Sequence, residues 1–337
     1  MFITVLSLFS FSGASADKTP QISARSAVLM NEGRTLYEKR AHERLPMAST
    51  TKLMTAILAI ENAKAQDAVK ILPEYCMVEG SSMYLKPDTE RTVEELLKGL
   101  LLVSGNDAAL ALAHHISGSV EAFTALMNTK AKELGMQDTH FQNPHGLSHE
   151  EHYSSAYDLA LLMEYCMENE TFSRIAAMKS FENDGAVLLN HNKLLFICKG
   201  CEGGKTGYTM AAGRCLVSCC RREGVSLVCV TLSAPEDWND HMALYDWCYS
   251  THSPRCLTEN QRLSVSLASA DEEEAYLVPE KEHHAFVSDA SEIRLDIRLP
   301  WLVFKPIRQG DAGAKVSIFV DGVEYGEYYL IYDKDYF

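Results

Sequence analysis

Two groups of strand-like segments, separated by a long stretch of helical patterns, most constrain the fold of this chain. At residues 24–38, apolar residues flank a turn of sequence Asn-Glu-Gly-Arg, as in a β-hairpin. At residues 214–232, two β-prone runs flank the sequence Arg-Arg-Glu-Gly. This order predicts an α+β or mixed three-layer domain, in which helices cover an antiparallel sheet whose first and last strands meet.

Several helices are expected between the two hairpins. Apolar residues recur at helical spacing from Ser49 to Ala63 and predict a buried face. Residues 92–95 have the spacing of a capping box and precede a leucine-rich run, so a second buried helix begins there. This helix is interrupted at residues 104–107, which we expect to form a polar corner. A further helix is expected from about Val120 to Leu134.

The chain is long enough for one large domain and a smaller one, since it has 337 residues. Helical periodicity fades after about Pro254. Apolar residues then alternate at 293–299 and 316–320, as in half-buried strands. We therefore expect the larger domain at residues 17–255 and a small all-β domain at residues 258–337.

The N-terminal residues resemble a secretory signal. A short apolar run, Phe2 to Phe11, is followed by small residues that offer a cleavage site before Asp17. We interpret residues 1–16 as a signal peptide and expect an extracytoplasmic protein. No Lys or Arg precedes the apolar run, so a buried strand is the alternative. No apolar stretch reaches the roughly 20 residues of a membrane span.

Charge and cysteine content narrow the classes of partner. The formal net charge is −15, and the basic residues are scattered, which argues against a nucleic-acid groove or an anionic membrane surface as partner.

The ten cysteines could form disulfides in an exported protein. However, Cys215, Cys219 and Cys229 lie in apolar, strand-like runs, where cysteine packs as a small hydrophobe. Cys198-x-x-Cys201 is one pair without a second, which is weak support for zinc. We favour buried thiols and leave the redox state open.

Ser49 and Lys52 form an S-x-x-K motif at the start of the first expected helix. On a helix the two side chains lie one turn apart on one side, so the lysine nitrogen can hydrogen-bond the hydroxyl that it must deprotonate. Burial and a neighbouring cation would lower the pKa of the lysine enough for it to act as a base. The motif alone is weak, because a solvated lysine near a helix start is common.

Two further segments strengthen this interpretation. Ser104 and Asn106 form an S-x-N motif in the polar corner, and Lys205-Thr206-Gly207 forms K-T-G upstream of a strand. Together with S-x-x-K, these motifs are the signature of penicillin-binding proteins and class A β-lactamases. A hydroxyl at Ser104 can relay a proton to a leaving amine, and the Asn106 amide can bind a substrate carbonyl. The K-T-G segment supplies a positive field, a hydrogen bond to a carboxylate and room for substrate along a strand edge.

The surroundings of these motifs resemble the low-molecular-mass D-alanyl-D-alanine carboxypeptidases. The resemblance covers roughly residues 24–250. It rests on the sequences around Ser49 and Ser104, where a glycine stands in the middle of the second motif, and extends to the segments 143–147, 154–158 and 204–209. The β-rich C-terminal region is similar to the second domain of that family. The resemblance implies a β-lactamase/transpeptidase-like antiparallel sheet flanked by helices.

The resemblance also implies an activity: removal of the terminal D-alanine from a peptidoglycan pentapeptide through an acyl-enzyme at Ser49. Lys52 and Ser104 would then be catalytic, and Asn106, Lys205, Thr206, Gly207 and Tyr208 would bind the substrate, with backbone N–H groups of Ser49 and Tyr208 as the oxyanion hole. β-Lactams would acylate the same serine. We expect no metal and no cofactor.

Two departures from the family pattern stand out. Members often carry a basic residue after the closing strand that helps to hold the substrate carboxylate, but residues 235–241 offer only His241. Many members also end in an amphipathic anchoring helix, whereas this sequence ends in a strand-like, acidic segment, so membrane association stays open.

Three other functions are compatible with some of these motifs. A D,D-endopeptidase would use the same chemistry, and a non-catalytic wall-binding or β-lactam-sensing module would keep the pocket without turnover. A β-lactamase is less favoured, because no carboxylate motif is evident that would activate water for deacylation. His145, His149 and His152 do not match a zinc motif, and His145 is better interpreted as holding a loop near the site.

Overall fold

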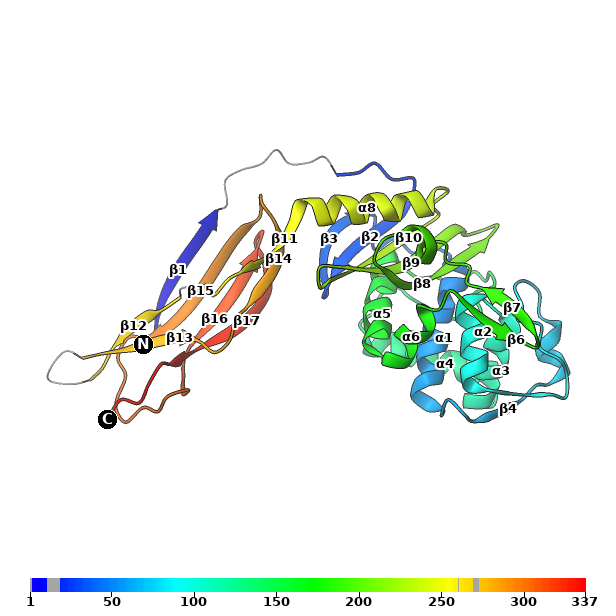
Figure 1. Cartoon of the computed structure of the whole chain (residues 1–337), viewed down its shortest axis with the longest axis horizontal. Helices are drawn as coiled ribbons and strands as arrows, with labels where there is room; N and C mark the ends of the chain where they lie inside the picture. Colours follow the sequence, from blue (N-terminus) through cyan, green and yellow to red (C-terminus); the bar gives the residue numbers. More distant parts are fainter. Residues whose placement is uncertain (1, 11–18, 260, 269–272) are drawn as a thin grey trace. The chain divides into compact units, whose positions relative to one another are not determined.

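The computed structural model describes residues 2–10, 19–259, 261–268 and 273–337, and of residues 2–10 only the backbone. They form two compact units (Figure 1). One comprises residues 19–247, and the other comprises residues 248–337 together with strand β1 (Phe2–Ser10). From the sequence we placed the boundary at residues 255–258. The structure divides the chain earlier, between residues 247 and 248. This boundary lies within helix α8 (Asp237–Thr251), whose first residues belong to the larger unit and whose last residues belong to the second unit.

The larger unit is built on one antiparallel sheet of five strands in the order β3-β2-β10-β9-β8. The two expected hairpins are present, and β2 pairs with β10, so the first and last strands of this unit meet as predicted. Each hairpin turn places a glutamate and then a glycine at positive φ, as a two-residue turn requires. The strands are β2 (Ser26–Asn31), β3 (Arg34–Lys39), β8 (Cys201–Thr209), β9 (Gly213–Arg222) and β10 (Val225–Leu232).

Helices cover both faces of this sheet (Figure 1). Helix α8 lies on one face, and α5 and α6 pack on the other, with α1 to α4 beyond them. Helix α1 is buried among its neighbours, which accounts for its nearly continuous apolar sequence. These helices are α1 (Lys52–Asn62), α2 (Val93–Leu102), α3 (Asn106–Ser117), α4 (Val120–Glu133), α5 (Ala156–Glu168) and α6 (Glu170–Ala176). The predicted α+β class is confirmed.

Shorter elements connect the helices to the sheet. Thr92 and Glu95 form the expected capping box at the start of α2. Glycine at positive φ ends α3 at Gly118, as a helix C-terminus commonly requires. The short elements are η1 (Ala48–Thr51), β4 (Ala68–Lys70), η2 (Pro73–Met77), β5 (Glu90–Thr92), β6 (Ser180–Asn183), β7 (Ala186–Leu189) and α7 (Leu194–Ile197).

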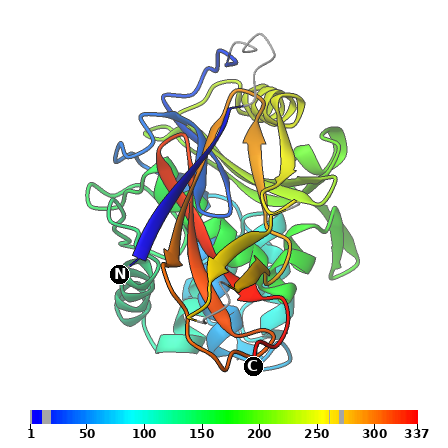
Figure 2. The same ribbon diagram turned by 90° about the vertical axis from the view of Figure 1, so that its left-hand side faces the viewer.

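The second unit is a β structure, as expected for the C-terminal region. Figure 2 shows its long strands side by side, in the sheet order β1-β15-β16-β17-β13-β12, and β11 pairs separately with β14. Alternate residues of β15 and β16 are buried, which matches the alternation in the sequence. The strands are β11 (His252–Cys256), β12 (Leu263–Ser266), β13 (Glu274–Pro279), β14 (His284–Ser288), β15 (Glu292–Pro300), β16 (Ala312–Val320) and β17 (Val323–Tyr332).

The N-terminal apolar segment forms a strand in this structure. Backbone pairing between β1 and β15 is antiparallel and runs from Phe2 opposite Pro300 to Ser10 opposite Glu292. This is the arrangement that the strand alternative anticipates, and residues 11–16 of the expected signal lie outside the described residues. Removal of residues 1–16 stays a prediction. In the described part of the chain, no helix is long and apolar enough to cross a bilayer.

Candidate active site

The S-x-x-K motif lies where a short 3-10 turn passes into helix α1. Ser49 belongs to the turn η1, and Lys52 is the first residue of α1. Their spacing brings Lys52 Nζ to 2.9 Å from Ser49 Oγ. The hydroxyl of Thr51 donates to the carbonyl oxygen of Ala48 at 2.8 Å, which holds the turn that carries Ser49. The structure therefore brings this predicted pair into hydrogen-bond contact.

The amine of Lys52 has three partners. Besides Ser49, Nζ contacts Asn106 Oδ1 at 2.7 Å and the carbonyl oxygen of His145 at 2.5 Å. A neutral amine has two N–H groups and one lone pair. If the two N–H groups donate to the Asn106 and His145 oxygens, the lone pair is directed at the Ser49 hydroxyl, as a general base requires.

The surroundings of Lys52 favour this neutral form. The side chain is fully buried, and burial lowers the pKa of Lys52 well below its ordinary value. The positive charge of Lys205 lowers this pKa further, while the carboxylate of Asp107 raises it and so opposes the shift in part. Burial and one neighbouring cation thus act in the direction that the sequence argument anticipated.

The S-x-N motif forms the corner between α2 and α3. Ser104 adopts a positive φ of 63°, and its hydroxyl is buried with no hydrogen-bond partner among the described residues. Asn106 donates from Nδ2 to the carbonyl oxygen of Glu79 at 2.6 Å, so its Oδ1 is turned toward Lys52. The adjacent Asp107 accepts from the backbone N–H groups of Met83 and Leu85 and fixes the loop before α2.

The K-T-G motif lies within strand β8, at the edge of the sheet. From the sequence this motif is expected before a strand, whereas it lies inside β8, whose glycines and lysine lack an apolar alternation. Lys205 is buried, and burial lowers its pKa to about 7. A Cβ on Gly207 would lie 3.0 Å from the backbone nitrogen of Ser49 and 3.1 Å from the Met47 oxygen. Glycine therefore permits the close approach of β8 to the nucleophile turn.

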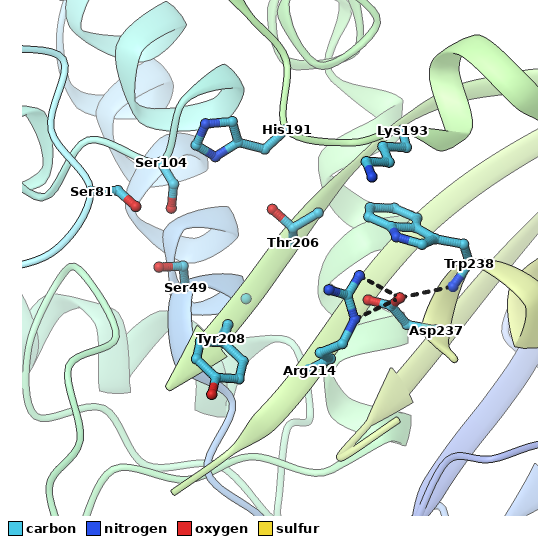
Figure 3. Close-up of a pocket in the computed structure, with 11 residues that line it drawn as sticks. Ser49, Ser81, Ser104, His191, Lys193, Thr206, Tyr208, Arg214, Asp237 and Trp238 are labelled. Carbon is cyan, nitrogen blue, oxygen red and sulfur yellow. Dashed lines mark hydrogen bonds and ion pairs between the residues drawn. The ribbon is translucent and has the colours of Figure 1, made fainter. Parts of the chain in front are cut away.

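The three motifs meet at one pocket of about 350 Å³. In Figure 3 the hydroxyls of Ser49, Ser104 and Thr206 surround one side of the pocket, and the Arg214 guanidinium lies on the other. Several residues that line this pocket lie outside the three motifs and were not predicted from the sequence. The lining residues are Ser49, Ser81, Ser104, His191, Lys193, Thr206, Gly207, Tyr208, Arg214, Asp237 and Trp238.

Arg214, at the start of β9, is the main residue that sequence reasoning missed. Its Nε and Nη2 donate to Asp237 Oδ1 at 3.0 and 2.7 Å, and the guanidinium carbon lies 5.4 Å from the centre of the Trp238 ring. These contacts fix the orientation of a charged group whose side chain is 41% exposed. An arginine at a strand start gives no signal by itself, because only the sheet register brings β9 beside the K-T-G strand.

His241 does not line the pocket, which corrects its candidacy as a carboxylate-binding residue. It is fully buried on α8, where Nδ1 lies 2.7 Å from Ser218 Oγ and Nε2 lies 3.0 Å from Thr231 Oγ1. Burial lowers the pKa of His241 to about 3. Its imidazole is therefore a neutral core group that joins α8 to strands β9 and β10.

Two histidines support the nucleophile turn. The carbonyl of His145 binds Lys52, as expected for a residue that holds a loop near the site. The Gln142 N–H donates to Nδ1 of His152 at 2.9 Å, so the other nitrogen, Nε2, carries the proton and donates to Thr51 Oγ1 at 2.7 Å. Burial lowers the pKa of both imidazoles to about 3, so both are neutral.

Comparison with known proteins agrees with this geometry. The model of the serine peptidase family S11, D-alanyl-D-alanine carboxypeptidase, matches residues 13–236. Over 319 residues the chain is 32% identical to D-alanyl-D-alanine carboxypeptidase DacF of Bacillus subtilis, covering 89% of this chain and 82% of that protein. Over 215 residues it is 39% identical to DacA of Escherichia coli, covering 59% of this chain and 53% of that protein.

Solved structures show the same fold over both units. Penicillin binding protein 5 of Haemophilus influenzae aligns with a TM-score of 0.77 at 27% identity, covering 95% of this chain and 99% of that one. The D-alanyl-D-alanine carboxypeptidase of Mycobacterium tuberculosis aligns with a TM-score of 0.67 at 31% identity, covering 70% and 95%. The chain belongs to the D-alanyl-D-alanine carboxypeptidase family of serine peptidases. The predicted transpeptidase-like fold and the predicted family are confirmed.

Proposed function

We propose that this enzyme removes the terminal D-alanine from peptidoglycan pentapeptides through an acyl-enzyme at Ser49. The observation that carries the proposal is the position of Lys52 Nζ, 2.9 Å from Ser49 Oγ and held by Asn106 and His145. The orientation of a buried, neutral amine toward a serine hydroxyl is what nucleophile activation needs. The names of the relatives support the same substrate class.

Acylation begins when Ser49 Oγ attacks the carbonyl carbon of the penultimate D-alanine and its proton passes to Lys52. The carbonyl oxygen becomes an oxyanion, which the backbone N–H groups of Ser49 and Tyr208 stabilise. The tetrahedral intermediate then collapses, the C–N bond breaks, and the proton on Lys52 passes through the Ser104 hydroxyl to the leaving amine, so that Lys52 is neutral again. In the second half of the cycle Lys52 takes a proton from the attacking water and returns it to Ser49 Oγ as the ester bond breaks.

The carboxylate of the terminal D-alanine binds at the other end of the pocket, to Thr206 and Arg214. The Asp237 contacts use Nε and Nη2 of Arg214, and no acceptor binds Nη1 among the described residues. The contacts with Asp237 and Trp238 hold the guanidinium in place before substrate arrives, which lowers the entropic cost of binding. Arg214 thus replaces the basic residue that is missing from residues 235–241.

β-Lactams acylate the same serine, because their strained amide presents a carbonyl and a carboxylate at comparable positions. The decisive experiment is intact mass spectrometry after benzylpenicillin, with the adduct mapped to a peptide, alongside an assay of D-alanine release. Ser49→Ala should abolish both the adduct and the release. Ser173→Ala, at a half-buried position of α6 that does not line the pocket, should retain both. Retention of either by Ser49→Ala contradicts the proposal.

Export places the enzyme at its substrate. Residues 1–16 form a cleaved signal, and the mature chain begins at Asp17. N-terminal sequencing of the protein recovered outside the cytoplasm should therefore read from Asp17. A mature protein that retains Phe2 to Ser10 would contradict this assignment and would favour β1 as a permanent strand.

A further inference from the structure

Three cysteines gather beside the segment that forms one wall of the pocket. Cys198 follows helix α7, and Cys201 on β8 is the cross-strand partner of Cys220 on β9. The same segment carries His191 and Lys193, which line the pocket. A bond between Cys198 and β9 would therefore tie this wall to the sheet.

The contacts single out Cys198 and Cys220 within this cluster. Their sulfurs lie against the same carbonyl oxygen, that of Lys199, at 3.9 Å for Cys198 and 3.4 Å for Cys220. The Cys220 thiol lowers the pKa of Cys198, and the Cys198 thiol raises the pKa of Cys220. The sulfur of Cys201 is turned instead toward Asn192 Nδ2 at 3.9 Å and the Gly203 oxygen at 3.7 Å.

Arg222 contacts Cys198 and favours its thiolate form. Its Nη2 lies 3.9 Å from Cys198 Sγ, while its Nε donates to the Lys199 oxygen at 3.0 Å and its Nη1 pairs with Asp246 at 2.7 Å. The neighbouring Cys220 thiol and the Arg222 cation lower the pKa of Cys198, against the opposing effects of burial and of Asp246. The lower pKa favours the thiolate, which is the form that attacks disulfides.

We propose that Cys198 is a reactive thiol that undergoes thiol–disulfide exchange with a small disulfide and then forms a disulfide with Cys220. In the first step the Cys198 thiolate attacks one sulfur of the oxidant, whose S–S bond breaks and releases one thiolate. In the second step Cys220 loses its proton to solvent and attacks the Cys198 sulfur, which releases the second thiolate. The oxidant gains two electrons and the protein loses two. This site goes beyond the proposed function and does not depend on it.

The test uses the reduced full-length chain and 2-hydroxyethyl disulfide at pH 7, followed by acid quenching, alkylation, intact mass and peptide mapping. The expected product has lost two hydrogens and contains a peptide pair joined through Cys198 and Cys220. Cys220→Ser should instead trap one mercaptoethanol on Cys198, and Cys198→Ser should give neither product at this site. Cys201→Ser should still form the bridge.

A second measurement needs no disulfide and tests the reactivity of Cys198 alone. At pH 7, iodoacetamide should alkylate Cys198 several-fold faster than Cys76, although Cys76 is the more exposed thiol, because burial and Asp107 raise the pKa of Cys76. Arg222→Gln should slow the alkylation of Cys198 several-fold. A bridge to Cys201, the absence of an adduct in Cys220→Ser, or equal rates at Cys198 and Cys76 would overturn the proposal.

Discussion

At the scale of single residues, the site depends on two buried lysines, one of which lowers the pKa of the other. Lys205 lowers the pKa of Lys52, and it can do so because both side chains are excluded from water. A positive neighbour disfavours the protonated amine, so more of Lys52 is in the basic form at neutral pH. The S-x-x-K and K-T-G motifs are therefore coupled through electrostatics as well as through substrate contacts.

Replacing Lys205 by glutamine should raise the pKa of Lys52, because a cation that disfavoured its protonated form is removed. The acid limb of the acylation rate should then move to higher pH. Stopped-flow acylation by a fluorescent penicillin between pH 5 and 10 measures this shift. A uniform loss of rate with an unchanged pH profile would show that Lys205 acts only on substrate binding.

Arg214 offers a second test at this scale. Arg214→Gln should lower kcat/KM for a peptide ending in D-Ala-D-Ala by about 10- to 100-fold, because a hydrogen bond between charged groups contributes roughly 1.5–3 kcal/mol. Amidation of the substrate carboxylate should cost the native enzyme a similar factor and the variant almost nothing more. If the two losses multiply instead, Arg214 does not contact that carboxylate.

At the scale of elements, the approach of β8 to the nucleophile turn decides whether the site forms. Gly207 of β8 lies against Ala48 and Ser49, and the loop at Gly146 packs still more closely, since a Cβ there would lie 2.0 Å from the Ala48 oxygen. One strand edge, one loop and the nucleophile turn thus meet without side chains between them.

Gly207→Ala should separate β8 from the turn and reduce acylation by at least about 100-fold, because small displacements at reacting groups cost large factors in rate. The overpacking should cost about 1–3 kcal/mol of stability, so the variant should remain folded. Gly326→Ala, where a Cβ meets no atom within 4 Å, is the matched control. Acylation kinetics and thermal melting together distinguish a local effect from unfolding.

The sequence predicted those elements that local side-chain patterns specify. The hairpins, the capping box at Thr92 and the helix that follows Ser49 were predictable, because turn residues and apolar spacing specify them locally. Strand β8 was not, since its Gly207 is required by contacts with a turn about 160 residues earlier in the chain. Arg214 was missed for the same reason: its place in the pocket follows from strand pairing, and the local sequence is that of an ordinary surface arginine.

At the scale of the whole molecule, three buried neutral histidines in the larger unit make its stability depend on pH. The pKa values of His145, His152 and His241 are lowered to about 3, whereas an unfolded histidine has its ordinary value of 6.5. Between these values the unfolded chain binds more protons than the folded chain. The stability contribution is therefore complete above about pH 6.5 and is lost as the pH falls toward 3.

His241 isolates this effect, because it lies in the core away from the pocket, between Ser218 and Thr231. Each such histidine adds up to about 1.4 kcal/mol per pH unit to the fall in unfolding free energy. His241→Asn should reduce the slope between pH 4 and 6 by about that amount, whatever its effect at pH 7. Urea unfolding of the variant and the native chain at several pH values gives the slopes. An unaltered slope in His241→Asn would mean that His241 takes up its proton at the same pH in the folded and unfolded chains, which contradicts a neutral imidazole in the core.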